Sequence, residues 1–304
     1  MVPSLSVEER PAFRNLSGLD WAFLLSALLL AGIGVATVGS ASDVMGADYM
    51  TRQAAWVGIG VVVMIFLAAF NYRSLVDLGL ILYLVGIALL VLVLFFGRVV
   101  GGARGWFAIG GFSLQPGELA KLTTAIFLAR YLAGVNRRHL GIKQIAVSTM
   151  IVIVPVILLA LQPDLGSAVM YLPMLAAMLL VAGVRWKVLA SVVLVVVLAG
   201  AGLWTFGLHD YQRDRVYTFV NPEADPLGAG YQVQQSKIAV GSGELLGKGY
   251  GQGTQSQLRF LPARHTDFIF AVLAEEWGFA GTITVLALYA VFLLNGLRMA
   301  IRAR

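Results

Sequence analysis

The sequence contains no cysteine and only three histidines among its 304 residues. A disulfide framework, a thiol nucleophile and a thiolate-ligated metal are therefore excluded, and the widely separated histidines form no recognisable zinc motif. Charge is also scarce, because only 12% of the residues are charged, against about 25% in an ordinary soluble domain. Such a composition excludes a water-soluble globular protein.

Long apolar runs are what the sequence has in abundance, and 59% of its residues are hydrophobic. Eight runs approach the roughly 20 residues that a helix needs to cross a bilayer. A helix bundle is the natural fold for them, since a bilayer offers the backbone no hydrogen-bond partners. We predict an all-α polytopic membrane protein with about eight transmembrane helices, at residues 21–39, 54–70, 78–96, 114–132, 145–161, 165–184, 188–206 and 268–297.

The basic residues predict how these spans are oriented. If the N-terminus is inside, the cytoplasmic segments carry twelve Lys and Arg residues, and the short segments on the opposite side carry four. This bias places both termini in the cytoplasm, in agreement with an even number of spans. Membrane anchoring also accounts for the net charge of +6, so nucleic acid is not expected as a partner. A mostly polar N-terminal segment precedes the first span, which is therefore predicted to be an anchor rather than a cleaved signal.

A segment of close to sixty residues, 207–265, separates the last two predicted spans. We predict that it is an extracytoplasmic loop, a functional subregion within a single transmembrane domain covering 1–304. Its glycine-rich run, 241–253, matches neither the dinucleotide fingerprint nor a phosphate-binding P-loop. Residues 231–240 lack Gly and Pro, which favours a short helix there.

Polar residues collect near the predicted outer ends of the spans, where charge is costly. Glu118 and Lys121 are three residues apart and therefore share one helix face. They form a salt bridge or contact an anionic substrate, and the two interpretations are compatible. We predict that one outward-facing cavity gathers these groups, namely Arg104, Glu118, Lys121, Gln162, Asp164 and Asp267.

Asp267 stands where a polar loop becomes an apolar helix. Thr266 or Asp267 could cap that helix, because either side chain accepts the free N–H groups of a first turn. If Thr266 is the cap, the Asp267 carboxylate is free to act as a general base, with its pKa set by Arg264, His265 and partial burial. Glu275 and Glu276, two turns on, are either a buried polar patch or partners of Asp267.

Several strings, from about residue 16 to the end of the chain, carry a specific resemblance. They are RGW at 104–106, LQPGELAKL at 114–122, QPDLGSA at 162–168, NP at 221–222, DPLG at 225–228, GYQ at 230–232 and GTQSQLRFLPARHTDFIFAV at 253–272. The sequence thereby resembles the SEDS family of bacterial cell-wall polymerases. Gln162 and the GTQSQ run resemble the elongation branch, RodA, more than the division branch, FtsW.

The resemblance implies a peptidoglycan glycosyltransferase that polymerises lipid II, an undecaprenyl-pyrophosphate-linked disaccharide, into glycan strands during cell elongation. It implies a site on the outer face of the bacterial cytoplasmic (inner) membrane. Asp267 matches the family's essential acidic residue, and the expected catalytic role is general base. The candidate substrate-binding residues are Arg104, Glu118, Lys121, Asp164, Arg215 and His265.

The residues suit this chemistry. An inverting transfer needs one base to deprotonate the acceptor hydroxyl, and departure of the lipid pyrophosphate needs positive charge. Arg104, Lys121, Arg215 or a divalent cation (Mg²⁺ or Mn²⁺) would supply it; the sequence defines no metal ligands and no other cofactor. A lipid-II flippase or other transporter is an alternative, as is a membrane scaffold for cell-wall enzymes.

The resemblance also implies partners: a class B penicillin-binding protein with transpeptidase activity, and other membrane proteins of the elongation complex. The family has ten spans, whereas this chain stops after the eighth predicted one. On that basis the last helical pair is missing, and the chain is a C-terminal truncation or an unusual member.

Overall fold

The computed structural model describes residues 20–42, 49–69, 72–100, 102–109, 112–135, 141–185, 190, 229–258, 260–261 and 264–302. The chain divides into two compact units. We call residues 71–207 the central unit and residues 1–70 with 208–304 the terminal unit. Each is described by itself.

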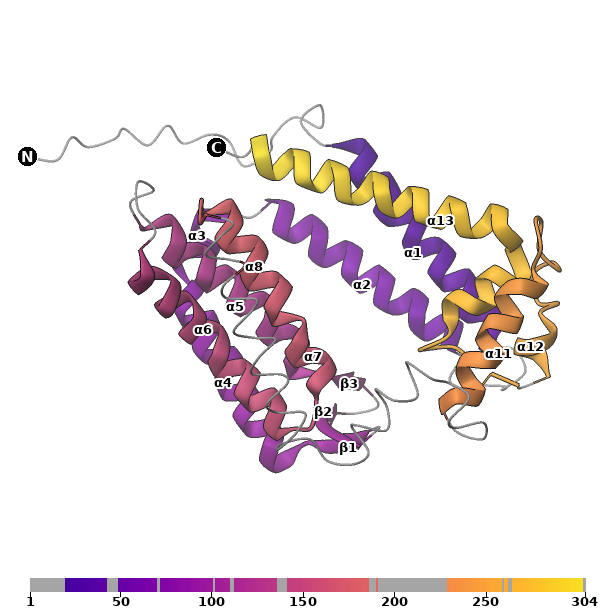
Figure 1. Ribbon diagram of the computed structural model, residues 1–304, viewed down its shortest axis with the longest axis horizontal. Helices are drawn as coiled ribbons and strands as arrows, with labels where there is room; N and C mark the ends of the chain where they lie inside the picture. The colour runs from indigo at the N-terminus through magenta and orange to yellow at the C-terminus, as the bar shows by residue number, and fades with distance from the viewer. Residues whose placement is uncertain are drawn as a thin grey trace, which may run out of the picture. The chain divides into compact units, whose positions relative to one another are not determined.

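The central unit is a group of helices with a small sheet at one end (Figure 1). Its apolar core lies between the helices, where Leu90, Leu128, Leu159 and Leu179 are completely or almost completely buried. The Tyr83 side chain lies in this core, and its hydroxyl donates to the carbonyl of Ile151 at 2.9 Å. The elements are α3 (Tyr72–Asp77), α4 (Gly79–Phe96), β1 (Arg98–Val100), β2 (Ala103–Ile109), β3 (Phe112–Leu114), α5 (Pro116–Ala133), α6 (Ile142–Leu161), α7 (Leu165–Val169) and α8 (Tyr171–Val181).

The sheet was not predicted from the sequence. Its three short strands are antiparallel in the order β1-β2-β3, with Val99 opposite Arg104 and Phe107 opposite Leu114. Pro116 then opens α5 at its first turn, where a proline costs no backbone hydrogen bond. The predicted fourth span therefore begins two residues late, after a strand rather than within a helix.

The terminal unit combines helices from both ends of the chain. They are α1 (Trp21–Ser42), α2 (Tyr49–Ala69), α11 (Ala229–Ser242), α12 (Thr254–Gln257) and α13 (Ile269–Arg302). α1 runs along α13, and the rings of Phe23 and Phe292 stack with centroids 4.5 Å apart. α11 and α12 pack beside the first turns of α13 (Figure 1). α11 confirms the short helix predicted at 231–240.

α13 is broken at Gly278, whose backbone is in the left-handed region at φ 64° and ψ −160°. The loop that follows α11 fills this break with its own backbone. N–H groups of the loop donate to the carbonyls of Glu275 (3.0 Å) and Glu276 (2.9 Å), and loop carbonyls accept from the amides of Phe279 (2.8 Å) and Ala280 (3.0 Å). A broken helix near a bilayer is tolerated where protein satisfies its backbone, as here.

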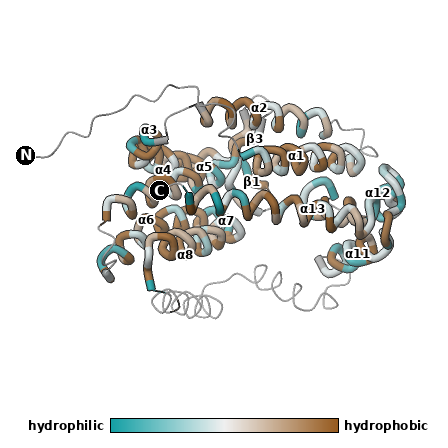
Figure 2. Tube along the Cα trace, turned by 90° about the horizontal axis from the view of Figure 1, so that it is seen from above, coloured by the Kyte–Doolittle hydropathy of each residue, from teal (hydrophilic) through white to brown (hydrophobic). Residues whose placement is uncertain are grey.

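Five described helices are long and apolar enough to cross a membrane: Trp21–Ser42, Tyr49–Ala68, Gly79–Phe96, Ile142–Leu161 and Ile269–Arg302. Their positions agree with those of predicted spans one, two, three, five and eight. In place of the fourth predicted span the structure has α5, a helix that carries charged residues. In place of the sixth predicted span it has a shorter apolar stretch, Leu165–Val181. The seventh predicted span lies outside the described residues. Figure 2 shows the long helices as mostly hydrophobic, in contrast to the paler surroundings of α12.

Candidate functional site

Asp267 lies in a turn, residues 264–268, that leads into α13. The helix begins at Ile269, and the carbonyl of Phe268 accepts its first hydrogen bonds. The cap position is therefore Phe268, and Thr266 comes too early in the chain to be the helix cap that the sequence suggested. The Asp267 carboxylate is exposed, and no hydrogen bond or ion pair joins it to the described residues. A carboxylate with unoccupied acceptor sites is available to take a proton from a ligand.

The turn around Asp267 is held by a buried arginine. Arg264 is only 1% exposed. Its Nε donates to the carbonyl of Ala41, at the end of α1, at 2.8 Å, and its Nη1 donates to the carbonyl of Ser256 in α12. Burial of a guanidinium is costly unless its donors are used, so these bonds fix the start of the turn.

Two further side chains anchor the same turn. The ring of His265 stacks on that of Tyr49 from α2, with centroids 4.7 Å apart. Phe268 packs against a small buried cluster of Ala239, Leu261 and Ala271. Asp267 is thus an exposed acid between side chains that are held in place.

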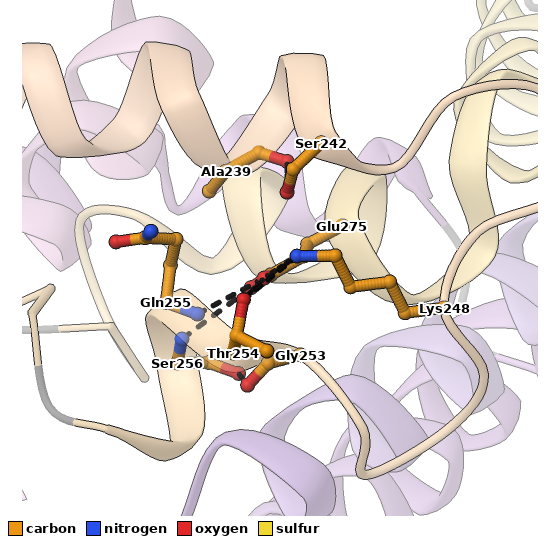
Figure 3. Close-up of polar contacts among 8 residues, drawn as sticks. All are labelled: Ala239, Ser242, Lys248, Gly253, Thr254, Gln255, Ser256 and Glu275. Atoms are coloured by element: carbon orange, nitrogen blue, oxygen red, sulfur yellow. Dashed lines mark hydrogen bonds and ion pairs between the residues drawn. The ribbon is translucent and has the colours of Figure 1, made fainter.

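Next to this turn, Glu275 is completely buried on α13. Its Oε1 accepts from the Nζ of Lys248 at 2.7 Å, the hydroxyl of Thr254 at 3.0 Å and the amide of Gln255 at 2.9 Å. Its Oε2 accepts from the amide of Ser256 at 3.4 Å. Figure 3 shows the four donors converging on the one carboxylate. These charge-assisted bonds explain how a buried acid is accommodated.

Glu276 is equally buried and accepts a hydrogen bond from the hydroxyl of Ser40 on α1. The two carboxylates form a buried polar patch, and no described hydrogen bond joins either of them directly to Asp267. Lys248 lies in the glycine-rich run 241–253, which matches no phosphate-binding motif. Its pairing with an acid 27 residues away could not be found from spacing alone.

In the central unit, Asp164 organises a second polar cluster. Its Oδ1 accepts from the amide of Ser167 at 3.1 Å and so caps α7, and its Oδ2 accepts from Nε2 of Gln115 at 3.1 Å. The buried Gln162 donates from Nε2 to the carbonyl of Leu90 at 3.1 Å. A carbon placed on Gly105 would lie within 4.0 Å of all three polar side chains, so the β2 backbone passes directly over them.

The basic residues of this unit are more accessible. Arg104 lies in β2, just before Gly105. Its amide donates to the carbonyl of Gln162 at 3.2 Å, and its exposed guanidinium donates to the carbonyl of Leu94 at 3.3 Å. Lys121 and Glu118 form the predicted salt bridge at 2.7 Å, with the Lys121 side chain 24% exposed and that of Glu118 57% exposed. Ion pairs that are partly exposed to solvent contribute little stability.

The structure therefore brings the predicted site residues into two groups. Arg104, Gln162 and Asp164 lie together, with the Glu118–Lys121 pair on the neighbouring helix, and His265 and Asp267 share one turn in the other unit. Arg215 lies outside the described residues. A single cavity shared by both groups stays a prediction. Among the described residues, no cluster of three His, Asp or Glu side chains could hold a metal ion, and the question of a divalent cation stays open.

The central unit also has an apolar cavity of about 320 Å³ at the C-terminal ends of α5 and α8. Leu132, Val135, Met178 and Val181 are among its lining residues. It lies at the opposite end of α5 from Glu118 and Lys121 and contains no charged side chain, so it is not part of the polar site.

The fold and these clusters define a multi-pass α-helical membrane protein with charged groups at helix ends. Comparison with known proteins makes this more specific: residues 20–304 match the family model of FtsW, RodA and SpoVE, described as a cell cycle protein. The chain belongs to this family. The predicted SEDS resemblance is thereby confirmed, and so is the all-α polytopic fold class.

The similarity extends over most of the chain. It is 41% identical over 288 residues to the peptidoglycan glycosyltransferase MrdB of Escherichia coli K12, covering 94% of this chain and 77% of that one. A chain in a structure described as a peptidoglycan synthase complex that coordinates polymerization and crosslinking has a TM-score of 0.75 and 32% identity, covering 91% of this chain and 77% of that one. The rod shape determining protein RodA of Thermus thermophilus has a TM-score of 0.66 and 29% identity, covering 95% and 77%. These relatives support the RodA branch over FtsW.

Proposed function

We propose that this protein is a peptidoglycan glycosyltransferase that polymerises lipid II into glycan strands during cell elongation, with Asp267 as the general base. The proposal is carried by the 41% identity to a peptidoglycan glycosyltransferase over 94% of the chain. The exposed Asp267 carboxylate on a turn anchored by buried Arg264 supports the residue assignment.

The proposed reaction is a single displacement. A carboxylate oxygen of Asp267 takes the proton of the acceptor sugar hydroxyl as that oxygen attacks the anomeric carbon of the donor. The new glycosidic bond forms while the bond from the anomeric carbon to the pyrophosphate oxygen breaks, with inversion. Lys121 and Arg104 stabilise the departing pyrophosphate in this proposal, since both are partly or fully exposed cations.

The remaining candidates have matching proposed roles. Asp164 caps α7 by accepting from the Ser167 amide. The carbonyl of the nearby Gln162 accepts from the Arg104 amide, so Asp164 is proposed to shape the surroundings of Arg104. Glu118 orients Lys121 through their salt bridge. Arg215 and His265 are proposed to bind the substrate.

We propose that the protein resides in the bacterial cytoplasmic membrane with both termini inside and the site facing outward. The excess of Lys and Arg in the segments assigned to the cytoplasm supports this orientation. Because the chain has no cysteine, single cysteines introduced at 138 and 244 can be labelled by an impermeant maleimide in intact cells and in lysed cells. Labelling of position 244 in intact cells, with protection of 138 until lysis, is expected; the reverse would overturn the orientation.

A class B penicillin-binding protein is the proposed partner, together with other membrane proteins of the elongation complex. The similarity to a chain of a synthase complex that coordinates polymerization with crosslinking supports this. A photo-crosslinking scan along the exposed face of α13 in cells would give a periodic set of adducts with the partner's membrane helix. Adducts without helical periodicity would count against a defined interface.

The decisive experiment is polymerisation of purified lipid II by Asp267→Asn. The substitution is isosteric and removes no described contact of the carboxylate, so folding is preserved, and the rate should fall by about 10² to 10⁴. Glu244→Gln is the matched control, because Glu244 is also an exposed acid in the same region, and it should keep the wild-type rate. Normal product lengths from Asp267→Asn would overturn the assignment, and lipid translocation without polymer from the wild type would favour a flippase.

A further inference from the structure

Glu275 is too deeply buried to touch a substrate, yet its bonds lead to the turn that carries Asp267. We infer that Glu275 is a positioning residue, which fixes the Asp267 carboxylate by holding α12 and, through α12, the Arg264 side chain. The inference rests on the proposed function for the catalytic role of Asp267.

The first step links Glu275 to α12. The helix has only four residues, too few to be stable without tertiary contacts. Glu275 binds its beginning through the hydroxyl of Thr254 and the amides of Gln255 and Ser256. A carboxylate is suited to the N-terminus of a helix, where free N–H groups concentrate positive charge.

The fit between α12 and the carboxylate is close. A carbon placed on Gly253, the residue before α12, would lie 2.7 Å from Oε2 of Glu275, which is closer than such atoms approach. A side chain at 253 would therefore have to displace the Glu275 carboxylate and the Ser256 hydroxyl. Lys248 contributes the counter-charge at 2.7 Å, and its Nζ also donates to the Thr254 hydroxyl at 2.7 Å.

The second step links α12 to the turn. The Ser256 amide donates to the Glu275 carboxylate, and the Ser256 carbonyl accepts from Nη1 of Arg264. Arg264 is three residues before Asp267 and opens the turn. Ser256 thus transmits the position of Glu275 to the guanidinium, whose other described anchor is the carbonyl of Ala41.

Loss of the Glu275 carboxylate should lower the rate of the reaction more than it weakens substrate binding. A displacement of about 1 Å at a reacting group can cost about 10² in rate. If α12 loses its carboxylate partner, Arg264 loses a fixed acceptor, and the Asp267 turn samples positions away from the acceptor hydroxyl. Glu244 serves as the comparison, because it is an exposed acid of the same unit with no described side-chain bond to α12 or to Arg264.

The test uses the absence of cysteine in the chain. Asp267→Cys provides one exposed thiol for a nitroxide label, and its spectrum in detergent reports the mobility of the turn independently of activity. In this background Glu275→Gln should add a mobile component, whereas Glu244→Gln should leave the spectrum unchanged. An unchanged spectrum with Glu275→Gln, or equal mobility with Glu244→Gln, would overturn the inference.

The kinetic arm uses the chain with Asp267 intact. Glu275→Gln should lower kcat for lipid II polymerisation by about tenfold to a hundredfold while KM changes less than about twofold. Thr254→Val is a milder variant, which removes one donor to Glu275 and keeps the Lys248 ion pair, and it should show the same two effects at reduced size. If Glu275→Gln does not fold, Thr254→Val decides: no added mobility and an unchanged kcat would overturn the inference.

The two arms also separate this inference from the proposed function. Full activity of Asp267→Asn would refute the general base, yet the nitroxide spectra would still show whether Glu275 fixes the turn. Loss of kcat in Glu275→Gln without any gain in mobility would leave Asp267 as base and refute the positioning role of Glu275.

Discussion

The Nζ of Lys248 lies 2.7 Å from Oε1 of the completely buried Glu275. This ion pair joins the loop after α11 to the first turns of α13. Removing one partner of a buried pair leaves the other charge without compensation. The pair therefore makes this part of the terminal unit sensitive to single substitutions.

Lys248→Met should destabilise the protein by about 3 kcal/mol, because Glu275 then lacks its counter-charge. The measurement is thermal unfolding in detergent, followed by intrinsic tryptophan fluorescence. Lys237→Met is the matched control: Lys237 is an exposed lysine of α11, and its replacement should leave the unfolding temperature nearly unchanged. Equal unfolding temperatures for the two variants would contradict a structural role for the pair.

Gly247→Ala should prevent normal docking of the loop on α13. The residue has φ 79°, and a carbon added to it would overlap the carbonyl of Glu276. Gly251 is a control with a similar φ of 71° and nothing within 4 Å of an added carbon. Gly251→Ala should cost only the roughly 1–2 kcal/mol of a left-handed alanine.

Size-exclusion chromatography of detergent extracts checks this pair of glycine variants. The expected result is a monodisperse peak for Gly251→Ala and aggregation for Gly247→Ala. Monodisperse, fully stable Gly247→Ala would mean that the loop does not approach the helix as closely as the structure shows.

Lys121→Met should reduce lipid II polymerisation by about 10² if this cation stabilises the departing pyrophosphate. Lys121→Arg retains the charge and should keep most of the activity, and Glu118→Gln should have a smaller effect because the lysine is still present. Initial rates at saturating lipid II are the measurement. Stability should change little in any of the three, since the Glu118 side chain is exposed and that of Lys121 is partly exposed.

His265 offers a test that separates packing from substrate contact. Its ring stacks on Tyr49, and such pairs contribute about 0.5–1.5 kcal/mol. His265→Phe should preserve the stack and the unfolding temperature but lower polymerisation, because its ring has no polar atom for the substrate. His265→Ala should lower both. Wild-type rates for His265→Phe would assign His265 to packing alone.

Much of the architecture follows from local composition. An uninterrupted apolar run such as 79–96 has to be a helix in a bilayer, because only a helix satisfies the backbone within one segment. The Glu118–Lys121 salt bridge was also predictable, since i and i+3 positions share a helix face. The strands around Arg104 were missed because three short strands have no strong periodic signal.

The sequence by itself determined the class of the protein: its apolar runs impose membrane helices, and its rare charges mark the candidate site. Only the tertiary structure decided which charges are partners. Glu275 pairs with Lys248 because a backbone break at Gly278 lets a distant loop dock against α13, and Glu276 pairs with Ser40 because α1 packs along α13. Contacts of this kind join residues far apart in the chain, and their free energy depends on burial that no local pattern specifies.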